Sequence, residues 1–292
     1  MPLFAGIVLA ERIERAEAQL MAGVSVAVRR RGAGTAGFVL PIAGGVASFA
    51  EEGSPFNKVA GLGFGGVPSV AALGEIERTF AARGAPVQIE LSHLADPAIG
   101  ALLTGRGYRL VSFENVLGRA LEGRPERVTP PGVEVRPSGE DELEAWLGVV
   151  VDASLHSDAQ GVPSHEEFPR EVIARAERDL VTAAGVRRYA ALRDGVIVGG
   201  ASFRLAQGVA QFTGAATAPA HRRRGRHRGR HHPAGVQVSA ERAAPRLRPA
   251  LYPCRPDQAT LSPHGPCPRR HQGPGPCPTR AFTTDTLATR RP

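Results

Sequence analysis

Hydrophobic and polar residues up to residue 225 follow helical spacing in some stretches and strand-like spacing in others. Residues 9–30 carry apolar side chains three or four positions apart, with charged residues between them, which predicts an amphipathic helix. These apolar positions are Ile13, Ala16, Leu20 and Val24. Short apolar runs bounded by glycine then alternate with longer helical stretches, so the order of elements predicts a mixed α/β protein.

The rest of the first half of the chain contains six further predicted segments. In order, they are two short strands in 34–52, a strand entering a glycine loop in 57–66, a helix in 69–84, a strand in 85–92, a helix in 96–107 and a closing pair of strands in 108–121. Asp96 is expected to cap the last of these helices, with Pro97 in its first turn.

A proline-rich stretch, 122–132, is the best linker candidate and separates a second unit from the first. The second unit begins with a predicted strand in 133–137 and a helix in 138–154, where Ser138 and Asp141 have the spacing of a capping box. Its later elements are a helix in 164–185 and three strands in 187–219, with tight turns at 193–196 and 206–208. We therefore expect one domain in 1–125 and a second in 126–225.

The charge of the chain is unevenly distributed. Residues 226–292 hold 12 Arg, no Lys and three acidic residues, whereas 1–225 hold 24 basic and 25 acidic residues, so the net charge of +8 arises in the last segment. That segment also holds 12 of the 25 prolines, all three cysteines and two aromatic residues. It has too little apolar surface to offset the entropy of ordering, and we expect a disordered tail.

The end of the third predicted strand of the second unit leads through Pro219 into Arg222-Arg223-Arg224-Gly225. A strand, two helices and a three-stranded meander with this ending resemble the GNAT N-acetyltransferase superfamily. The family's signature, Arg/Gln-x-x-Gly-x-Gly/Ala, opens a helix whose backbone N–H groups bind the pyrophosphate of acetyl-CoA, and the four residues match its first four positions. Without the family context, the same four residues are equally typical of a solvated basic turn.

The resemblance implies a fold, a co-substrate and a set of binding residues. It implies tandem acyl-CoA N-acyltransferase domains, of which the second is incomplete, and transfer of an acetyl group from acetyl-CoA to an amine. Ala216 and Thr217 would bind the pantetheine arm through backbone groups, and residues 222–225 would bind the pyrophosphate. The acceptor implied is a small-molecule or peptide amine whose identity the sequence leaves open.

The first unit resembles a degenerate copy of the same family. Its ending in 105–121 is similar to the helix-to-strand ending of such domains, but no arginine-rich loop follows a proline there. The glycine run in 61–66 fits no phosphate-binding fingerprint and is more typical of a glycine-rich turn. We expect only the second unit to carry cofactor-binding residues.

The sequence after Gly225 departs from the family. The family pattern has a small residue at position 227, followed by a helix and further strands, whereas this chain has His227 and no periodic segment. A sudden gain of Arg, Pro, His and Cys is typical of a GC-rich gene read out of frame. We therefore expect the residues from Arg226 onward to be out of frame, and binding and activity to be impaired in this chain.

Catalytic residues are less well defined. Acetyl transfer needs a group that accepts the proton of the amine, yet no Asp or Glu lies between Gly195 and Gly225. Glu166 and Glu167 lie on the segment that lines the acceptor groove in the family, with His156 and His165 nearby. Each is a candidate base, but its residue type and position are more typical of a solvated or capping residue.

Other functions of the tail are less consistent with its sequence. The spacings of Cys254, Cys267 and Cys277 do not match those of a zinc site, so we expect free thiols and no metal. The arginines lack interleaved aromatic residues and a recognition motif, so we expect no specific nucleic-acid partner. The alternative to an enzyme is a non-catalytic scaffold or a polyanion-binding protein that uses this tail. The chain has no apolar run long enough to span a membrane, so we expect a cytoplasmic protein that does not insert in a membrane. The sequence leaves its oligomeric state open.

Overall fold

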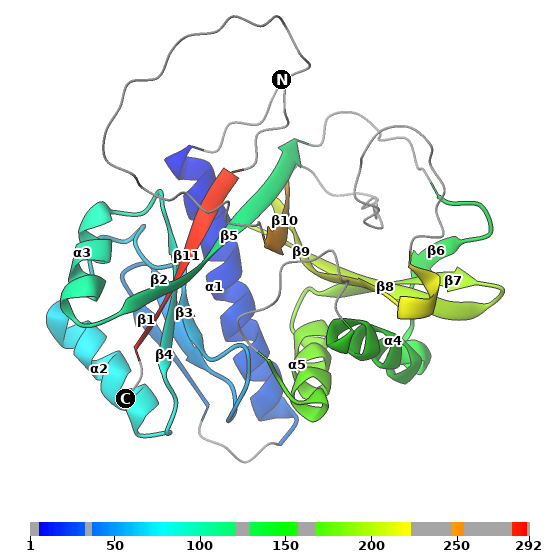
Figure 1. Cartoon of the computed structure of the whole chain (residues 1–292), viewed down its shortest axis with the longest axis horizontal. Helices are drawn as coiled ribbons and strands as arrows, with labels where there is room; N and C mark the ends of the chain where they lie inside the picture. Colours follow the sequence, from blue (N-terminus) through cyan, green and yellow to red (C-terminus); the bar gives the residue numbers. More distant parts are fainter. Residues whose placement is uncertain are drawn as a thin grey trace, which may run out of the picture.

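The computed structural model describes residues 6–32, 37–120, 129–156, 167–222, 247–253 and 282–290. They form two β-sheets with five α-helices packed against them (Figure 1). One sheet has seven strands in the order β1-β2-β3-β4-β11-β5-β10, and the other has four in the order β6-β7-β8-β9. The mixed α/β architecture predicted from the sequence is confirmed.

The first half of the chain follows the predicted order of elements. Its helices and strands are α1 (Ile7–Arg30), β1 (Phe38–Ile42), β2 (Gly45–Phe49), β3 (Lys58–Ala60), α2 (Val70–Ala81), β4 (Val87–Ser92), α3 (Pro97–Gly105) and β5 (Arg109–Ala120). As expected, the Asp96 carboxylate caps α3 by accepting a hydrogen bond from the Ala98 N–H at 2.9 Å. The predicted closing pair of strands is wrong, because β5 runs without a turn over 12 residues.

The second half also follows the prediction. Its elements are β6 (Glu134–Pro137), the 3₁₀ turn η1 (Glu140–Glu142), α4 (Leu143–Leu155), α5 (Arg170–Thr182), β7 (Arg187–Arg193), β8 (Val196–Ala206), β9 (Val209–Thr217) and the 3₁₀ turn η2 (Pro219–His221). The two hairpin turns have positive φ angles at Asp194, Gly195, Gln207 and Gly208. Such angles give a turn whose twist matches that of the flanking strands, which explains the tight β7–β8–β9 meander.

The capping box expected at Ser138 is wrong. The Ser138 hydroxyl is buried and accepts no hydrogen bond from a backbone N–H of the described residues. Instead, the Glu142 carboxylate accepts a hydrogen bond from the Gly139 N–H at 3.2 Å and is held by Arg136. The hydrogen bond from Arg136 is the main reason that the pKa of Glu142 falls to about 2.

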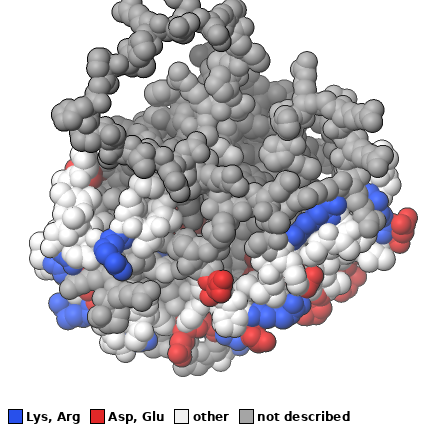
Figure 2. Space-filling model, viewed as in Figure 1, with Lys and Arg blue, Asp and Glu red and all other residues white. Residues whose placement is uncertain are grey.

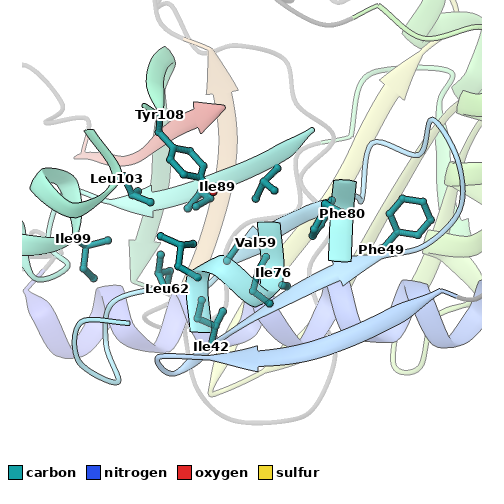
Figure 3. Packing of buried hydrophobic residues seen from close by; sticks show 13 residues of the cluster. Ile42, Phe49, Val59, Leu62, Ile76, Phe80, Ile89, Ile99, Leu103 and Tyr108 are labelled. Atoms are coloured by element: carbon teal, nitrogen blue, oxygen red, sulfur yellow. The ribbon is translucent and has the colours of Figure 1, made fainter. Parts of the chain in front are cut away.

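The main core of the seven-stranded sheet lies between the strands and the helices α2 and α3 (Figure 3). Phe80 and Ile89 are fully buried there, and Phe38, Phe49 and Phe80 make aromatic contacts with ring centroids 5.1 to 6.0 Å apart. Side chains of this size contribute about 2 kcal/mol each when buried. This core accounts for the strong apolar spacing of residues 69–92.

Helix α1 runs between the two sheets and packs against both (Figure 1). Leu20 and Val24 share an apolar cluster with Leu180 of α5, and Arg12 donates a hydrogen bond to the Gln207 carbonyl of the β8–β9 turn at 2.9 Å. Buried Arg204 of β8 donates to the Ala16 carbonyl at 2.9 Å. The helix that the sequence assigned to the first unit is therefore part of the packing of the second.

Two segments of the tail are described, and each is a strand of the seven-stranded sheet. Strand β10 (Leu247–Pro253) pairs with β5, and β11 (Phe282–Arg290) lies between β4 and β5, antiparallel to both. An extended segment can pair with strand edges through backbone hydrogen bonds alone. Such a strand needs no alternation of apolar and polar side chains, so the sequence pattern does not predict it. The prolines of β10 are tolerated because it is an edge strand. The rest of 226–292 lies outside the described residues.

Acidic and basic side chains lie side by side on the described surface over α4 and α5 (Figure 2). Arg178 of α5, for example, donates two hydrogen bonds of 2.7 Å to the Glu144 carboxylate of α4. This mixture agrees with the near balance of charges in residues 1–225.

Candidate functional site

The predicted cofactor-binding residues start at the end of β9, the last strand of the four-stranded sheet. Ala216 and Thr217 are the final two residues of the strand, and η2 follows directly. Arg222 comes next, whereas Arg223, Arg224 and Gly225 lie outside the described residues. The described part of the candidate site therefore consists of the β9 end, η2 and Arg222.

The guanidinium of Arg222 joins three segments of backbone. Its Nε donates to the Thr217 carbonyl at 3.0 Å, its Nη2 donates to the Ala153 carbonyl at 2.8 Å, and its Nη1 donates to the His156 carbonyl. The last two carbonyls are at the C-terminus of α4, where backbone acceptors lack partners within the helix. Arg222 thus ties the end of α4 to the end of β9.

The backbone of β9 alternates between β8 and the open edge. The Ala218 N–H donates to the Val198 carbonyl at 2.9 Å, so in this antiparallel ladder Ala216 also faces β8, opposite Gly200. Thr217 faces the other way, and its carbonyl accordingly accepts the hydrogen bond from Arg222. No described strand is hydrogen-bonded to that outer edge in the sheet, and β10 of the other sheet lies close to β9.

Glycines in β8 let α4 approach the sheet closely. A Cβ on Gly200 would lie 2.6 Å from Nε1 of Trp146, whose N–H donates to the Tyr189 carbonyl at 2.9 Å. Trp146 is almost fully buried and belongs to the cluster that joins α4 to β7 and β8. The close contact fixes where the C-terminus of α4 lies relative to β9.

Three titratable side chains gather at the C-terminus of α4. The Nδ1 of His156 lies 2.8 Å from the Asp152 carbonyl and 3.5 Å from its carboxylate Oδ1. Arg170, at the start of α5, lies 3.6 Å from the same Oδ1. The His156 side chain is 61% exposed. The group is adjacent to the β9 end, because one Arg222 guanidinium binds the carbonyls of both His156 and Thr217.

Of the other candidate bases, the structure describes only Glu167. Glu167 is exposed just before α5, while Glu166 and His165 lie outside the described residues. Among the described residues, no hydrogen bond or ion pair joins Glu167 to the β9 end.

One acidic residue in the second unit was not anticipated from the sequence. Glu177 of α5 precedes the buried residues Leu180 and Val181 by about one helical turn, so it lies toward the inward face of the helix, where it is half-buried. Burial raises its pKa to about 7, and among the described residues no hydrogen bond or ion pair offsets that effect. The signal in the sequence was weak, because Glu177 stands among other charged residues of an amphipathic helix.

The glycine run of the first unit follows β3 and precedes α2, but its backbone donors are used internally. The N–H groups of Gly63 and Gly65 donate to the Ala43 carbonyl at 3.3 and 3.1 Å. A Cβ on Gly65 would lie 2.5 Å from the Gly44 nitrogen, so the loop and the β1–β2 turn pack backbone to backbone. These contacts support its interpretation as a glycine-rich turn.

The described residues show two further absences. They contain no group of three or more His, Cys, Asp and Glu side chains placed to hold a metal ion, while Cys254, Cys267 and Cys277 lie outside them. Among the helices that the structure describes, none has the length and apolar character needed to cross a membrane.

Comparison with solved structures identifies the fold. A GCN5-related N-acetyltransferase from Kribbella flavida aligns over 91% of this chain and 95% of its own, with a TM-score of 0.50 and 18% identity. A tandem GNAT protein from the clavulanic acid biosynthesis pathway aligns over 87% of this chain and 78% of its own, with a TM-score of 0.44 and 12% identity. An aminoglycoside N-acetyltransferase solved with CoA aligns over 34% of this chain and 64% of its own, with a TM-score of 0.23 and 23% identity.

Sequence comparison adds no closer relative, because no family model and no curated protein matches the chain. The identities above are low, so the likeness concerns the fold. The chain has the mixed α/β fold of GCN5-related N-acetyltransferases.

Proposed function

We propose that the second unit is an acetyltransferase site that moves an acetyl group from acetyl-CoA to an amine. The observation that carries the proposal is the position of β9 as the last strand of its sheet, where it ends in Thr217 and leads through η2 into the arginine-rich turn 222–225. An extended pantetheine arm can bond to such an edge as an added strand does. The likeness of the fold to GCN5-related N-acetyltransferases supports the same assignment.

Within this proposal the predicted binding residues have distinct tasks. Thr217 offers its outward-facing N–H to the pantetheine arm, because its carbonyl is bound by Arg222, and Ala216 holds the strand in register with β8. Arg223, Arg224 and Gly225 would meet the pyrophosphate, because arginine gives charge-assisted hydrogen bonds and glycine allows close approach. Arg222 is bonded to three carbonyls, so its part is to hold the turn in place.

The acceptor is an amine, small or peptide-borne, and the reaction needs its nitrogen held in line with the thioester carbonyl. The sequence after Gly225 departs from the family pattern, in which a helix would complete the pyrophosphate site. We therefore propose that binding and activity are weakened in this chain.

Calorimetric titration with acetyl-CoA tests the assignment. We expect saturable binding with a dissociation constant of about 1 mM or lower, which corresponds to about 4 kcal/mol. Arg224→Ala should weaken that binding about tenfold, because one charge-assisted contact to the pyrophosphate is lost.

Arg187→Ala is the matched control. Arg187 is exposed on β7, so this substitution removes the same charge at a place away from the proposed site. It should leave the affinity unchanged. No saturable heat from acetyl-CoA, or equal losses in both variants, would contradict the proposed site.

A further inference from the structure

The imidazole of His156 has a defined orientation. A carbonyl oxygen only accepts hydrogen bonds, so the 2.8 Å contact with the Asp152 carbonyl requires the proton of the neutral ring to be on Nδ1. Nε2 then carries the free lone pair. The side chain is 61% exposed, and no described residue forms a hydrogen bond with Nε2, so this nitrogen is open to an incoming molecule.

The surroundings of the ring suit a group that gains a proton. Asp152 Oδ1 lies 3.5 Å from Nδ1, on the side of the ring away from Nε2. Arg170 lies 3.6 Å from the same oxygen and keeps the carboxylate beside the ring. This arrangement of a histidine oriented through Nδ1 with a carboxylate behind it is well suited to general-base chemistry.

The position of His156 relates it to the proposed acetyl-CoA edge. Its carbonyl and that of Thr217 are bound by the same guanidinium, so the α4 C-terminus and the β9 end are immediate neighbours. Trp146, packed against Gly200, holds the helix at that position. Other groups are less suitable, because Glu177 is on the inward face of α5 and His221 has a buried Nδ1 without a partner among the described residues.

Capping explains part of the contact but not all of it. An imidazole that bonds the carbonyl four residues earlier uses one nitrogen and satisfies one helix-end acceptor. The second nitrogen and the carboxylate beside the ring are not needed for that task.

We propose that His156 is the general base of the acetyl transfer, oriented by Asp152. This inference rests on the proposed function. As the amine nitrogen attacks the thioester carbonyl, a C–N bond forms, the C–S bond breaks, and His156 Nε2 accepts the proton that the nitrogen loses. The imidazolium returns that proton to the departing CoA thiolate, so the products are the acetylated amine and free CoA thiol, and the ring ends neutral.

Chemical labelling tests the location without knowledge of the acceptor. Diethylpyrocarbonate modifies free imidazole nitrogens, and the rate at His156 can be followed by peptide mass spectrometry. At ten times the dissociation constant of acetyl-CoA about 90% of the sites are occupied, so labelling of His156 should slow about tenfold. His93, exposed in the first unit, is the internal control and should react at the same rate with and without acetyl-CoA.

Kinetics test the role. With ethanolamine as the amine probe and release of CoA thiol as the readout, His156→Gln should lower kcat about 100-fold while the affinity for acetyl-CoA is unchanged. His156→Gln keeps the carbonyl that Arg222 binds, so the backbone arrangement is retained. His156→Ala should recover part of its rate when free imidazole is added, which a structural role would not produce. His93→Gln should have the wild-type rate.

The outcomes distinguish failure of the proposed acetyltransferase function from failure of the role of His156. Absence of acetyl-CoA binding, or binding without release of thiol by the wild-type chain, overturns the proposed function and this inference with it. Binding and turnover with undiminished labelling of His156, or with an unchanged kcat in His156→Gln, overturn the role of His156 alone.

Discussion

Arg31, at the end of α1, forms a two-point ion pair with Asp179 in the last turn of α5. Its Nε lies 3.0 Å from Oδ1 and its Nη2 lies 2.9 Å from Oδ2. The Nη2 is also 2.9 Å from the Glu51 carboxylate, which Arg175 of α5 binds from its other side. Burial alone would raise the pKa of Glu51, but the hydrogen bonds from Arg175 and Arg31 outweigh it and lower that pKa. Two helices far apart in the sequence are thereby joined.

Removing Arg31 should destabilise the whole described body. Asp179 is 2% exposed, so Arg31→Met would leave a buried carboxylate without its charge partner. The expected loss is about 3 kcal/mol in the free energy of unfolding, measured by urea denaturation at pH 7. Arg15→Met removes the exposed pair with Glu11 on the same helix and should cost less than about 1 kcal/mol. Similar losses in the two variants would mean that the Arg31 pair does not join the units.

Glu177 should make stability depend on pH. Its folded-state pKa of about 7 is above the ordinary value of 4.5, so the folded protein binds this proton more tightly than the unfolded chain does. The contribution is complete below about pH 4.5 and is lost as the pH rises through about 7. Glu177→Gln removes the ionisation, so at pH 8 the variant should be more stable than the wild type by about 1 to 2 kcal/mol.

The measurement is the difference in unfolding free energy between the Glu177 variant and the wild type from pH 4.5 to pH 8. That difference should grow with pH. Glu171→Gln, at an exposed position in the first turn of the same helix, is the control and should show no such trend. A difference that stays constant over this range would show that Glu177 does not lose a proton there.

Gly200 should tolerate no side chain. Its Cβ would lie 2.6 Å from Trp146 Nε1 and 2.7 Å from Val150 Cγ2, both in the packed interface of α4 with the sheet. Gly200→Ala should therefore lower stability by about 2 kcal/mol through overpacking. In contrast, a Cβ on Gly148 in α4 would meet nothing within 4 Å, so Gly148→Ala should raise stability by about 1 kcal/mol. Thermal unfolding of the two variants tests the opposite signs.

Arg222 should hold the candidate site together in the absence of ligand. Arg222→Ala removes three hydrogen bonds to carbonyls, so we expect amide hydrogen exchange in the last turn of α4 to increase about tenfold, as for a loss of about 1.4 kcal/mol in local stability. Exchange in α2, at the other end of the described body, should be unchanged. Unchanged exchange at Ala153 and Ser154 would show that these bonds contribute little.

The sequence predicted the elements well where local signals were strong. The apolar spacing of α1, the aspartate cap of α3 and the glycine turns of the β7–β9 meander each have a local physical cause, and each is confirmed. The candidate site was only partly predictable. The run from Ala216 to Gly225 is contiguous in sequence, and the site was proposed from its pattern. The hydrogen bonds of Arg222 to backbone carbonyls, however, depend on α4, which is more than 60 residues away.

Tertiary contacts explain the remaining differences. Ser138 has the residue type of a cap. The capping hydrogen bond is instead accepted by the Glu142 carboxylate from the Gly139 N–H, because Arg136 holds that carboxylate in place. Asp152 and His156 were ordinary members of a helical pattern, and their relation to the β9 end depends on how α4 packs on β8. Neither result is encoded in local spacing.

The tail provides the sharpest test of sequence against structure. Ala288 of β11 pairs with Ile89 of β4 and with Leu110 of β5, so proline there removes a ladder hydrogen bond in a strand with neighbours on both sides. If β11 belongs to the sheet, Ala288→Pro should cost about 3 kcal/mol and expose the edges of β4 and β5, so that the protein aggregates on heating. Ala288→Thr, which suits a strand, should behave like the wild type. A tail that is disordered, as its composition predicts, would leave the thermal unfolding of both variants unchanged, because no backbone hydrogen bond would then depend on position 288.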